Sequence, residues 1–239
     1  MRFDVVTLFP EIFSGYLGQS LLSKAIDDSL VEVQLHNLRD WSTDKHGKVD
    51  DRPFGGGPGM VLQVEPVVEC VEQVQQLGRP AADVILLSPQ GKPLDQQLVE
   101  QLASRPRHLL LCGRYEGFDQ RVIEILEPLE VSVGDYVLNG GEVAAMVLID
   151  SLIRLVPGVL GDERSAVDDS FSSGQRILEG PQYTRPREYR GLEVPEVLLN
   201  GDHEAIAQWR QAQAEEKTRA VRADLIRQQP PPHNEYEST

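Results

Sequence analysis

The chain has 239 residues, of which 40% are hydrophobic, and this is enough for one large domain or two moderate ones with a real core. Its formal net charge of −15 argues against a protein that attracts nucleic acid through bulk charge, and no run approaches the ~18 apolar residues that a membrane span requires. The charge is uneven: residues 1–160 carry 13 basic and 23 acidic side chains, whereas residues 174–229 carry nine of each, so a polyanion would have to bind local basic clusters, mainly in the second half.

Strands and helices alternate in the prediction from the N-terminus to residue 156. Short aliphatic runs predict strands, and apolar residues repeated every three to four positions predict helices. The predicted strands cover residues 2–8, 30–35, 84–87, 108–112 and 130–133. The predicted helices cover the region after Pro10, with a stripe of Leu17, Leu21, Leu22, Ala25 and Ile26, and residues 64–77, 94–103, 119–126 and 141–156. Such alternation indicates an α/β domain with a largely parallel sheet.

Two of these helices have distinctive ends. Phe118 or Asp119 is placed to cap the helix of residues 119–126. The helix of residues 141–156 is apolar over most of its length, so we expect it to be buried on most sides, and Pro157-Gly158 ends it.

Residues 52–60 form a loop rich in glycine and proline, with four glycines and two prolines. No Gly-Lys-Ser/Thr follows, so it is not a phosphate-binding Walker loop, and its glycine spacing does not match a dinucleotide-binding motif. A long loop inside a compact domain is either functional or a flexible surface segment. Arg52 and Phe54 favour a functional loop, because a cation and an aromatic ring are unusual in a simple connection.

Three predicted strands end at glycine-containing loops. The strand of residues 84–87 leads into residues 88–91, the strand of residues 109–112 into residues 113–117, and the strand of residues 131–133 into residues 134–142. Glycine at a strand end lets the backbone turn sharply and approach a ligand closely. In open α/β sheets, ligands bind outside the carboxyl ends of the strands. The sequence therefore predicts one pocket at these three ends, lined mainly by backbone.

The pattern changes after residue 160. Residues 161–174 are acidic, contain serine and glycine and have no core pattern, so they are predicted to be a mobile linker. Asp202 is placed to cap a helix that runs to about Gln228. We therefore expect an α/β domain at 1–160, this linker at 161–174, a small helical domain at 175–229 and a disordered tail at 230–239.

Cys70 and Cys112 lie far apart in the sequence, each in an apolar run. They are predicted to be buried free thiols rather than a metal or redox pair. The N-terminus is already strand-like and predicts no signal peptide. These features are compatible with a cytoplasmic protein.

Several short motifs stand in order along the chain. They are residues 55–60 (GGGPGM), 88–91 (SPQG), 112–119 (CGRYEGFD), 133–142 (VGDYVLNGGE), 169–171 (DSF), 183–186 (YTRP) and 200–203 (NGDH), the last followed by Trp209-Arg210. Together they resemble the bacterial tRNA (guanine-N1)-methyltransferase family TrmD, of the SPOUT superfamily. Each motif alone is weak, but their order and spacing over nearly the whole chain are specific. Ala144 departs from the family, where proline is common.

The resemblance implies fold, partners and reaction. The fold would be the SPOUT α/β fold, a largely parallel sheet with a deep trefoil knot in the C-terminal part of the domain, which pattern reading could not propose because knots are very rare. The protein would be a cytoplasmic homodimer with each active site shared between subunits. It would transfer a methyl group from S-adenosylmethionine to N1 of guanosine 37 of tRNA, and Mg²⁺ would be required, although the sequence shows no ligand cluster for it.

The family's cofactor loops fall on the three strand ends. The residues that the resemblance assigns to S-adenosylmethionine are Leu87, Ser88, Pro89, Gln90, Gly91, Gly113, Tyr115, Glu116, Ser132, Val133, Gly134, Asp135, Tyr136, Val137, Leu138, Gly140 and Gly141. Without the motif context, Tyr115 and Tyr136 would be read as ordinary core or rim aromatics.

The chemistry needs a base, because N1 of guanine carries a proton at neutral pH. The resemblance assigns this role to Asp169, although adjacent Asp168 is an equally acidic alternative and linker solvation is the simpler reading. An ordinary aspartate has a pKa of ~3.9, so it can take this proton only if charge developing at O6 is stabilised. Arg154 matches the residue that does so, and its alternative role is a cation at a helix C-terminus. Glu116 is a supporting catalytic candidate near the methyl donor.

Candidates for tRNA contact are cations and aromatics in the loop and the second domain: Arg52, Gly55, Arg185, Arg187, Arg190, His203, Trp209 and Arg210. Each could instead belong to a solvated surface. Two rival functions stay open at this point: another SPOUT RNA methyltransferase acting on ribose or another base, and a non-catalytic RNA-binding protein on the same fold. Asp169 and Arg154 favour base chemistry, since a ribose methylase has no charge at O6 to stabilise.

Overall fold

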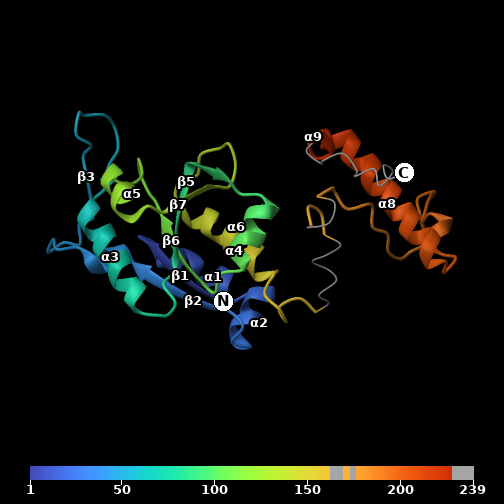
Figure 1. Ribbon diagram of the computed structural model, residues 1–239, viewed down its shortest axis with the longest axis horizontal. Helices are drawn as coiled ribbons and strands as arrows, with labels where there is room; N and C mark the ends of the chain where they lie inside the picture. The colour runs from blue at the N-terminus through green and yellow to red at the C-terminus, as the bar shows by residue number, and fades with distance from the viewer. Residues whose placement is uncertain (162–168, 173–175, 228–239) are drawn as a thin grey trace, which may run out of the picture. The chain divides into compact units, whose positions relative to one another are not determined.

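The computed structural model describes residues 1–161, 169–172 and 176–227 (Figure 1). The chain divides into two compact units, Met1–Gly161 and Asp162–Thr239. Most of the predicted linker at 161–174 and the whole predicted tail at 230–239 lie outside the described residues.

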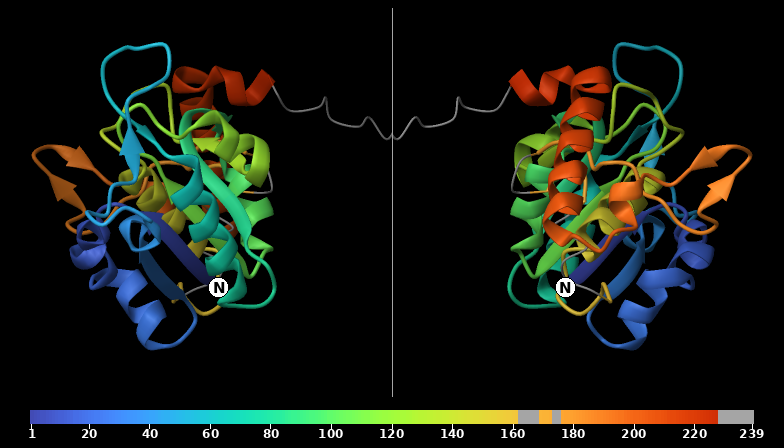
Figure 2. Two further views of the ribbon diagram at one scale, coloured as in Figure 1. Left: turned by 90° about the vertical axis from the view of Figure 1, so that its left-hand side faces the viewer. Right: turned by 90° about the vertical axis from the view of Figure 1, so that its right-hand side faces the viewer.

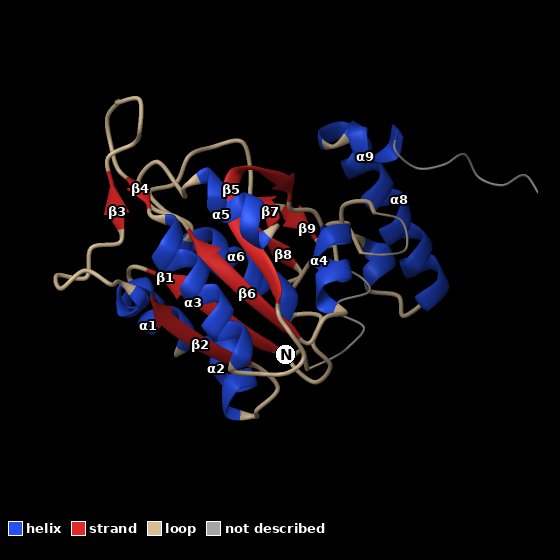
Figure 3. Ribbon diagram, turned by 60° about the vertical axis from the view of Figure 1, so that its left-hand side comes forward, coloured by secondary structure: helices blue, strands red, loops and turns tan. Residues whose placement is uncertain are grey.

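The first unit is built on a five-stranded sheet in which all neighbouring strands are parallel, as the sequence predicts. The strand order is β2-β1-β6-β5-β7. The strands are β1 (Arg2–Thr7), β2 (Glu32–Asn37), β5 (Asp83–Pro93), β6 (Arg107–Cys112) and β7 (Leu129–Ser132). Because parallel strands need crossover connections, helices join them and cover both faces (Figures 1 and 3).

Two apolar cores lie on the two faces of this sheet. Successive side chains of a strand point to opposite faces, so Leu110 and Cys112 belong to one core while Leu109 and Leu111 belong to the other. The first core is completed by α2 (Ser20–Asp27), α4 (Gln96–Ala103) and α6 (Glu142–Ile153), and the second by α3 (Val64–Gln76) and α5 (Gln120–Leu126). Cys70 and Cys112 are free and buried, which confirms the sequence prediction.

The helix starts follow local chemistry. Asp119 caps α5 by accepting a hydrogen bond from the backbone N–H of Arg121, which confirms one of the two predicted caps. Asp95 caps α4 in the same way through Leu98. The predicted helix after Pro10 is wrong in its continuity: it is divided into η1 (Pro10–Phe13), α1 (Ser14–Leu17) and α2, because Ser20 has φ +57° and Leu21 is exposed rather than part of the core stripe.

One further prediction needs correction. The strand predicted at 84–87 continues to Pro93, because the chain loops out at 88–91 and returns to β7: Leu87 and Lys92 both pair with Val131. The helix α6 is buried on most sides, as predicted, and is open along one side, where Val143 and Val147 are 53% and 45% exposed. Its opposite side packs into the first core.

His108, on β6, is fully buried, and its ring stacks on Phe3 with 5.7 Å between centroids. Burial lowers the pKa of His108, and Asp83 and two nearby backbone carbonyls oppose only part of that effect. The unfolded chain takes up a proton near the ordinary pKa of ~6.5, whereas the folded chain resists it. Stability from this group is therefore complete above that pH and declines as the pH falls through it.

We therefore expect the free energy of unfolding, measured with urea, to fall between pH 8 and pH 5.5. In His108→Leu this loss should be smaller, because leucine does not titrate and is suited to an apolar site. If the free energy of unfolding depended on pH identically in both proteins, His108 could not be the source of the loss.

The second unit is described over 169–172 and 176–227. It contains the short hairpin β8 (Glu188–Tyr189) and β9 (Leu192–Glu193), η3 (Glu196–Leu198), α8 (His203–Val221) and α9 (Ala223–Arg227). Asp202 caps α8, as predicted, through the N–H groups of Glu204 and Ala205. The single helix predicted to reach Gln228 is instead interrupted at Arg222, and the hairpin was not anticipated.

A strip of irregular chain packs along α8. Leu178 N–H donates to the Thr218 hydroxyl at 3.0 Å, and a Cβ on Gly180 would approach the Arg210 carbonyl at 3.1 Å. Among the described residues of this unit only Ala214 and Thr218 are buried, so its core is small. Within the described parts of the chain, no helix combines the length and apolarity needed to cross a bilayer.

Candidate active site

A cavity of about 390 Å³ lies at the carboxyl ends of the three neighbouring strands β6, β5 and β7, where the sequence predicts one pocket. Its walls come from residues 86–90, 113–118, 130–134 and 136–141, together with Gln120, Ile123 and Ala144. The volume falls in the range of small-molecule sites, roughly 300–1,000 Å³. The three glycine loops therefore meet around a space that fits a small ligand.

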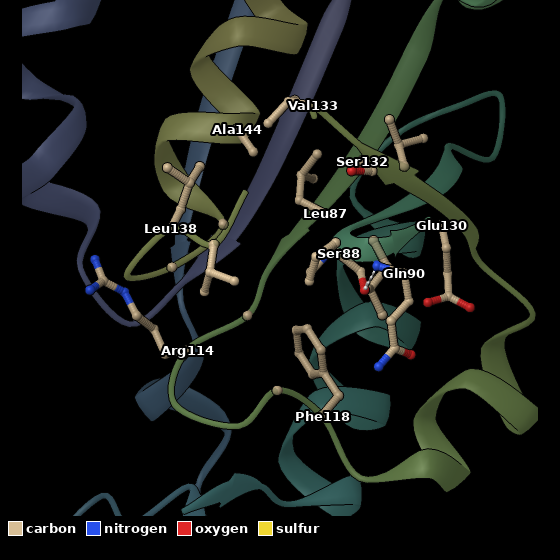
Figure 4. Close-up of a pocket in the computed structure, with 18 of the residues that line it drawn as sticks. Leu87, Ser88, Gln90, Arg114, Phe118, Glu130, Ser132, Val133, Leu138 and Ala144 are labelled. Carbon is tan, nitrogen blue, oxygen red and sulfur yellow. Dashed lines mark hydrogen bonds between the residues drawn. The ribbon is translucent and has the colours of Figure 1, made fainter. Parts of the chain in front are cut away.

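The walls of the cavity differ in chemistry. Figure 4 shows Leu87, Val133 and Leu138 gathered on one side and Gln90 and Glu130 on another. The charged residues that line the cavity are Arg114, Glu116 and Glu130. Arg114 is already paired with Glu142, so the two remaining carboxylates make the cavity acidic. Such a site suits a partly apolar, cationic ligand better than a polyphosphate.

The loops around the cavity approach one another too closely for side chains at several positions. A Cβ on Gly141 would lie 2.8 Å from the Cα of Cys112, and the N–H of Gly141 donates to the carbonyl of Gly113 at 2.9 Å. Gly134 has φ +149°, a conformation that L side chains rarely adopt. Glycine is thus required at Gly141 by the packing of backbone on backbone and at Gly134 by the backbone conformation.

Gly91 does not line the cavity but lies where the backbones of β5 and β7 pack closely beside it. A Cβ at this position would lie 2.5 Å from the carbonyl carbon of Glu130, because β5 returns here to β7. We expect Gly91→Ala to lower the free energy of unfolding by about 1–3 kcal/mol, the range for overpacking a tight site, and to weaken ligand binding in the adjacent cavity.

The matched control for Gly91→Ala is Gly15→Ala, since a Cβ on Gly15 meets no atom within 4 Å. It should change thermal stability little, or raise it slightly, because Gly15 lies in a helix. Equal midpoints of thermal unfolding for the two variants would refute the role given to Gly91.

A buried carboxylate ties the loops to the sheet. Glu142, 1% exposed, accepts hydrogen bonds from the Thr7 hydroxyl at 2.8 Å and from Nε of Arg114 at 3.0 Å. Arg114 also donates to the carbonyl of Asn139 and lies over the ring of Phe9, 4.5 Å from its centroid. The end of β1, the loop after β6 and the loop after β7 are therefore held in one arrangement.

The structure brings nearly all of the predicted cofactor residues to one place. All of them except Gly91 and Asp135 line the cavity, including Glu116, which is also the supporting catalytic candidate. Tyr115 and Tyr136 are 50% and 58% exposed, which places them at its rim and not in the core. Arg114, Gly117 and Asn139 also line the cavity and lie within the predicted loops. Sequence reasoning did not place these lining residues in a loop of the pocket: Leu86, Phe118, Gln120, Ile123, Glu130, Val131 and Ala144. Phe118 lies inside a recognised motif and could have been found there.

Arg52 and Gly55 lie in the glycine-rich loop between β3 (Asp50–Asp51) and β4 (Val61–Leu62), two short strands that the sequence did not predict. Both residues are exposed and do not line the cavity. The base of this loop is bonded to the cavity wall, since the N–H of Glu116 donates to the carbonyl of Met60 at 3.0 Å.

The predicted catalytic pair lies in two units. Arg154 is the half-buried residue that ends α6 in the first unit, and Asp169 is a half-buried residue of the second. Asp169 lines a hollow of about 460 Å³ within the second unit, together with Arg176, Gly180 and Arg210. The predicted base and one predicted tRNA contact are thus brought together.

Four other predicted tRNA contacts are exposed residues of the second unit. Arg185, Arg187 and Arg190 are exposed, and so is His203, the first residue of α8. The rings of Trp209 and Tyr183 are adjacent, with centroids 6.2 Å apart. Within residues 1–161, 169–172 and 176–227 no group of three or more His, Cys, Asp or Glu side chains is arranged to hold a metal ion.

Comparison with known proteins gives a consistent result. The sequence model of the family described as tRNA (Guanine-1)-methyltransferase TrmD matches residues 1–228. A tRNA (guanine-N(1)-)-methyltransferase from Rhodopirellula baltica is 65% identical over 227 residues, covering 95% of this chain and 94% of the relative. Proteins of the same name from Geotalea uraniireducens and Geobacillus kaustophilus are 51% and 49% identical, covering 95% and 96% of this chain and 90% and 93% of their own lengths.

Proposed function

Since the chain belongs to the tRNA (guanine-1)-methyltransferase family TrmD, we propose how its own residues carry out methylation of guanine N1 in tRNA. The family match and the shared names favour this activity over a ribose methylase and over a non-catalytic RNA-binding protein. The observation that carries the proposal is the cavity where three glycine loops meet, because it unites residues spread over more than fifty positions of the sequence.

The cavity is the proposed site for S-adenosylmethionine, which supplies an electrophilic methyl group on a sulfonium. The fit rests on two features of the walls. The apolar side formed by Leu87, Val133 and Leu138 suits an adenine ring, and the carboxylates of Glu116 and Glu130 suit a cation. A cofactor with several phosphates would find only Arg114 as a lining cation, already paired with Glu142.

Asp169 is the proposed general base and takes the proton from N1 of the target guanine. The guanidinium of Arg154 is proposed to donate to O6 as negative charge moves there, which makes loss of the N1 proton feasible for a carboxylate. Glu116 supports the site from the cavity wall. Both assignments come from the motif positions, and the two residues belong to the two units of the chain.

The finer proposal is that the target is guanosine 37, 3′ of the anticodon. The tRNA contacts are proposed to come from the cations and aromatics of the second unit and from Arg52 and Gly55 of the glycine-rich loop. Arg185, His203 and Arg210 are exposed, as phosphate contacts require. A requirement for Mg²⁺ is part of this proposal, and its ligands are not assigned.

We further propose a homodimer in the cytoplasm, with residues of both subunits in each active site. The support is an apolar strip beside the cavity. Val143 and Val147 lie one turn apart on the open side of α6, and Val137 and Leu138 are 87% and 38% exposed. A second copy of the chain would remove this apolar surface from water.

The test of the reaction is to incubate the protein with labelled S-adenosylmethionine and tRNA, digest the product and identify the labelled nucleoside. The proposal predicts 1-methylguanosine. Label in a 2′-O-methylated nucleoside would support the ribose-methylating alternative, and binding of S-adenosylmethionine without any transfer would support the non-catalytic one.

A further inference from the structure

The loop between β3 and β4 carries a completely exposed aromatic ring. Phe54 is 100% exposed, more than any other large apolar side chain of the described residues. Figure 3 shows this loop projecting from the first unit, and both views of Figure 2 agree. A phenylalanine in this state contributes nothing to folding and exposes apolar surface to water. Such a ring is best explained by a partner that covers it.

The position of the loop is fixed relative to the candidate active site. The N–H of Leu62 donates to the carbonyl of Gly117 at 2.9 Å, and the N–H of Asp119 donates to the carbonyl of Leu62 at 2.9 Å. Gly59 lies directly against the side chain of Glu116, so that a Cβ there would overlap it. Residues 115–118 therefore line the cavity and also contact the base of the loop, at Gly59, Met60 and Leu62.

The charges around Phe54 suit a nucleotide. Asp51 is paired with Lys48 at 2.9 Å, and its carboxylate also accepts a hydrogen bond from the backbone N–H of Arg52. The Arg52 guanidinium makes no hydrogen bond or ion pair with another residue of the described chain. A cation thus lies two residues from the ring. An unpaired nucleotide offers the matching chemistry, a flat base for the ring and a phosphate for the guanidinium.

Base stacking gives this acidic unit a way to bind RNA that does not depend on positive charge. Residues 1–160 carry ten more acidic than basic side chains, so phosphate attraction alone cannot hold RNA against the first unit. Every base has an aromatic face, and stacking on a protein ring needs no net positive charge.

We propose that Phe54 is a stacking platform for an unpaired base of the RNA substrate, with Arg52 contacting a neighbouring phosphate. This inference rests on the proposed function, since it takes the substrate to be tRNA. The base stacked on Phe54 would differ from the methylated one, because the ring does not line the cavity. Its role is to place a single-stranded part of the tRNA at a fixed offset from the site of methyl transfer.

The test compares Phe54→Ala, Phe54→Trp and the control Leu77→Ala, which truncates another exposed apolar side chain of the same unit, 58% exposed. The dissociation constant for fluorescently labelled tRNA and the KM for tRNA should rise about five- to a hundredfold in Phe54→Ala, the range for loss of one stacked base. Phe54→Trp should bind as tightly as the wild type. Leu77→Ala should behave like the wild type, and no variant should change S-adenosylmethionine binding or the midpoint of thermal unfolding.

Unchanged tRNA binding in Phe54→Ala would overturn the inference. So would a shift in sedimentation of Phe54→Ala towards a smaller species, because the ring would then be covered by a second copy of the chain. Failure of the proposed function gives a different result, because the wild type would then bind S-adenosylmethionine and tRNA but form no 1-methylguanosine. In that case the comparison of tRNA binding among the variants would still decide the role of Phe54.

Discussion

Replacing Asp169 by asparagine is expected to lower the rate of methyl transfer by about 10²- to 10⁴-fold, the usual contribution of a positioned general base. Asparagine keeps the size of the side chain but cannot accept the proton of guanine N1. Binding of S-adenosylmethionine should be unchanged, because Asp169 is not among the residues that line the cavity of the first unit. Single-turnover rates with excess enzyme would measure the chemical step, and calorimetry would measure cofactor binding.

The sequence supplies a matched control for this change. Asp168 precedes Asp169, so Asp168→Asn removes one negative charge at nearly the same place. It should retain a rate near that of the wild type. The rate of Asp169→Asn should rise with pH, because the N1 proton must then leave to solvent. A wild-type rate in Asp169→Asn, or an equal loss in both variants, would refute the assignment of the base.

Replacing Arg154 by alanine is expected to slow the chemical step by about 10²- to 10³-fold, as loss of one preorganised charge-stabilising donor does. Arg154→Lys should recover only part of this loss, since an ammonium keeps the charge but not the planar pair of donors. The competing role is structural. Arg154 ends α6, and a cation at a helix C-terminus contributes about 0.3–1 kcal/mol to stability.

Two measurements separate these roles. If Arg154 is catalytic, the single-turnover rate falls while urea unfolding changes by no more than the small helix-end contribution. A normal single-turnover rate together with a lowered unfolding free energy would return Arg154 to a structural role. The single-turnover rate of Arg154→Lys also separates the two roles, because lysine preserves the helix-end charge but not the donor geometry. A catalytic role predicts only partial recovery of the rate.

The strands and their loops could be predicted because their signals are local. Residues 109–112 are uniformly apolar because β6 is buried on both faces between β1 and β5. Gly113 and Gly141 mark places where backbone packs on backbone, and the hydrogen bond between them joins two loops that the sequence separates by 28 positions. Parallel sheets put such loops at one edge, which is why three motifs sufficed to place a pocket.

Other features depend on partners distant in the sequence. Residues 88–91 have the composition of a turn, and only their return to Val131 makes them part of β5. Glu142 has the pattern of an exposed residue in the first turn of a helix, but Thr7 and Arg114 draw it into the interior. The exposed side of α6 was not predicted, because Val143 and Val147 are as apolar as the buried residues between them.

The residues proposed to act on the substrate could be named only through the resemblance. Asp169 and Asp168 cannot be distinguished by composition or periodicity, and Arg154 has an adequate structural explanation. The net charge argued against an RNA-binding protein, whereas the family match establishes a tRNA methyltransferase family. Bulk charge misleads here because Arg185, Arg187, Arg190 and Arg210 of the second unit are exposed cations within an otherwise acidic chain.

The most direct test of the central claim uses two tRNA transcripts that differ only in guanosine or adenosine at position 37. Transfer of labelled methyl from S-adenosylmethionine is measured to each. We expect transfer to the guanosine transcript and none to the adenosine transcript. Equal transfer to both would contradict methylation at guanosine 37, because the methylated atom would then lie outside position 37.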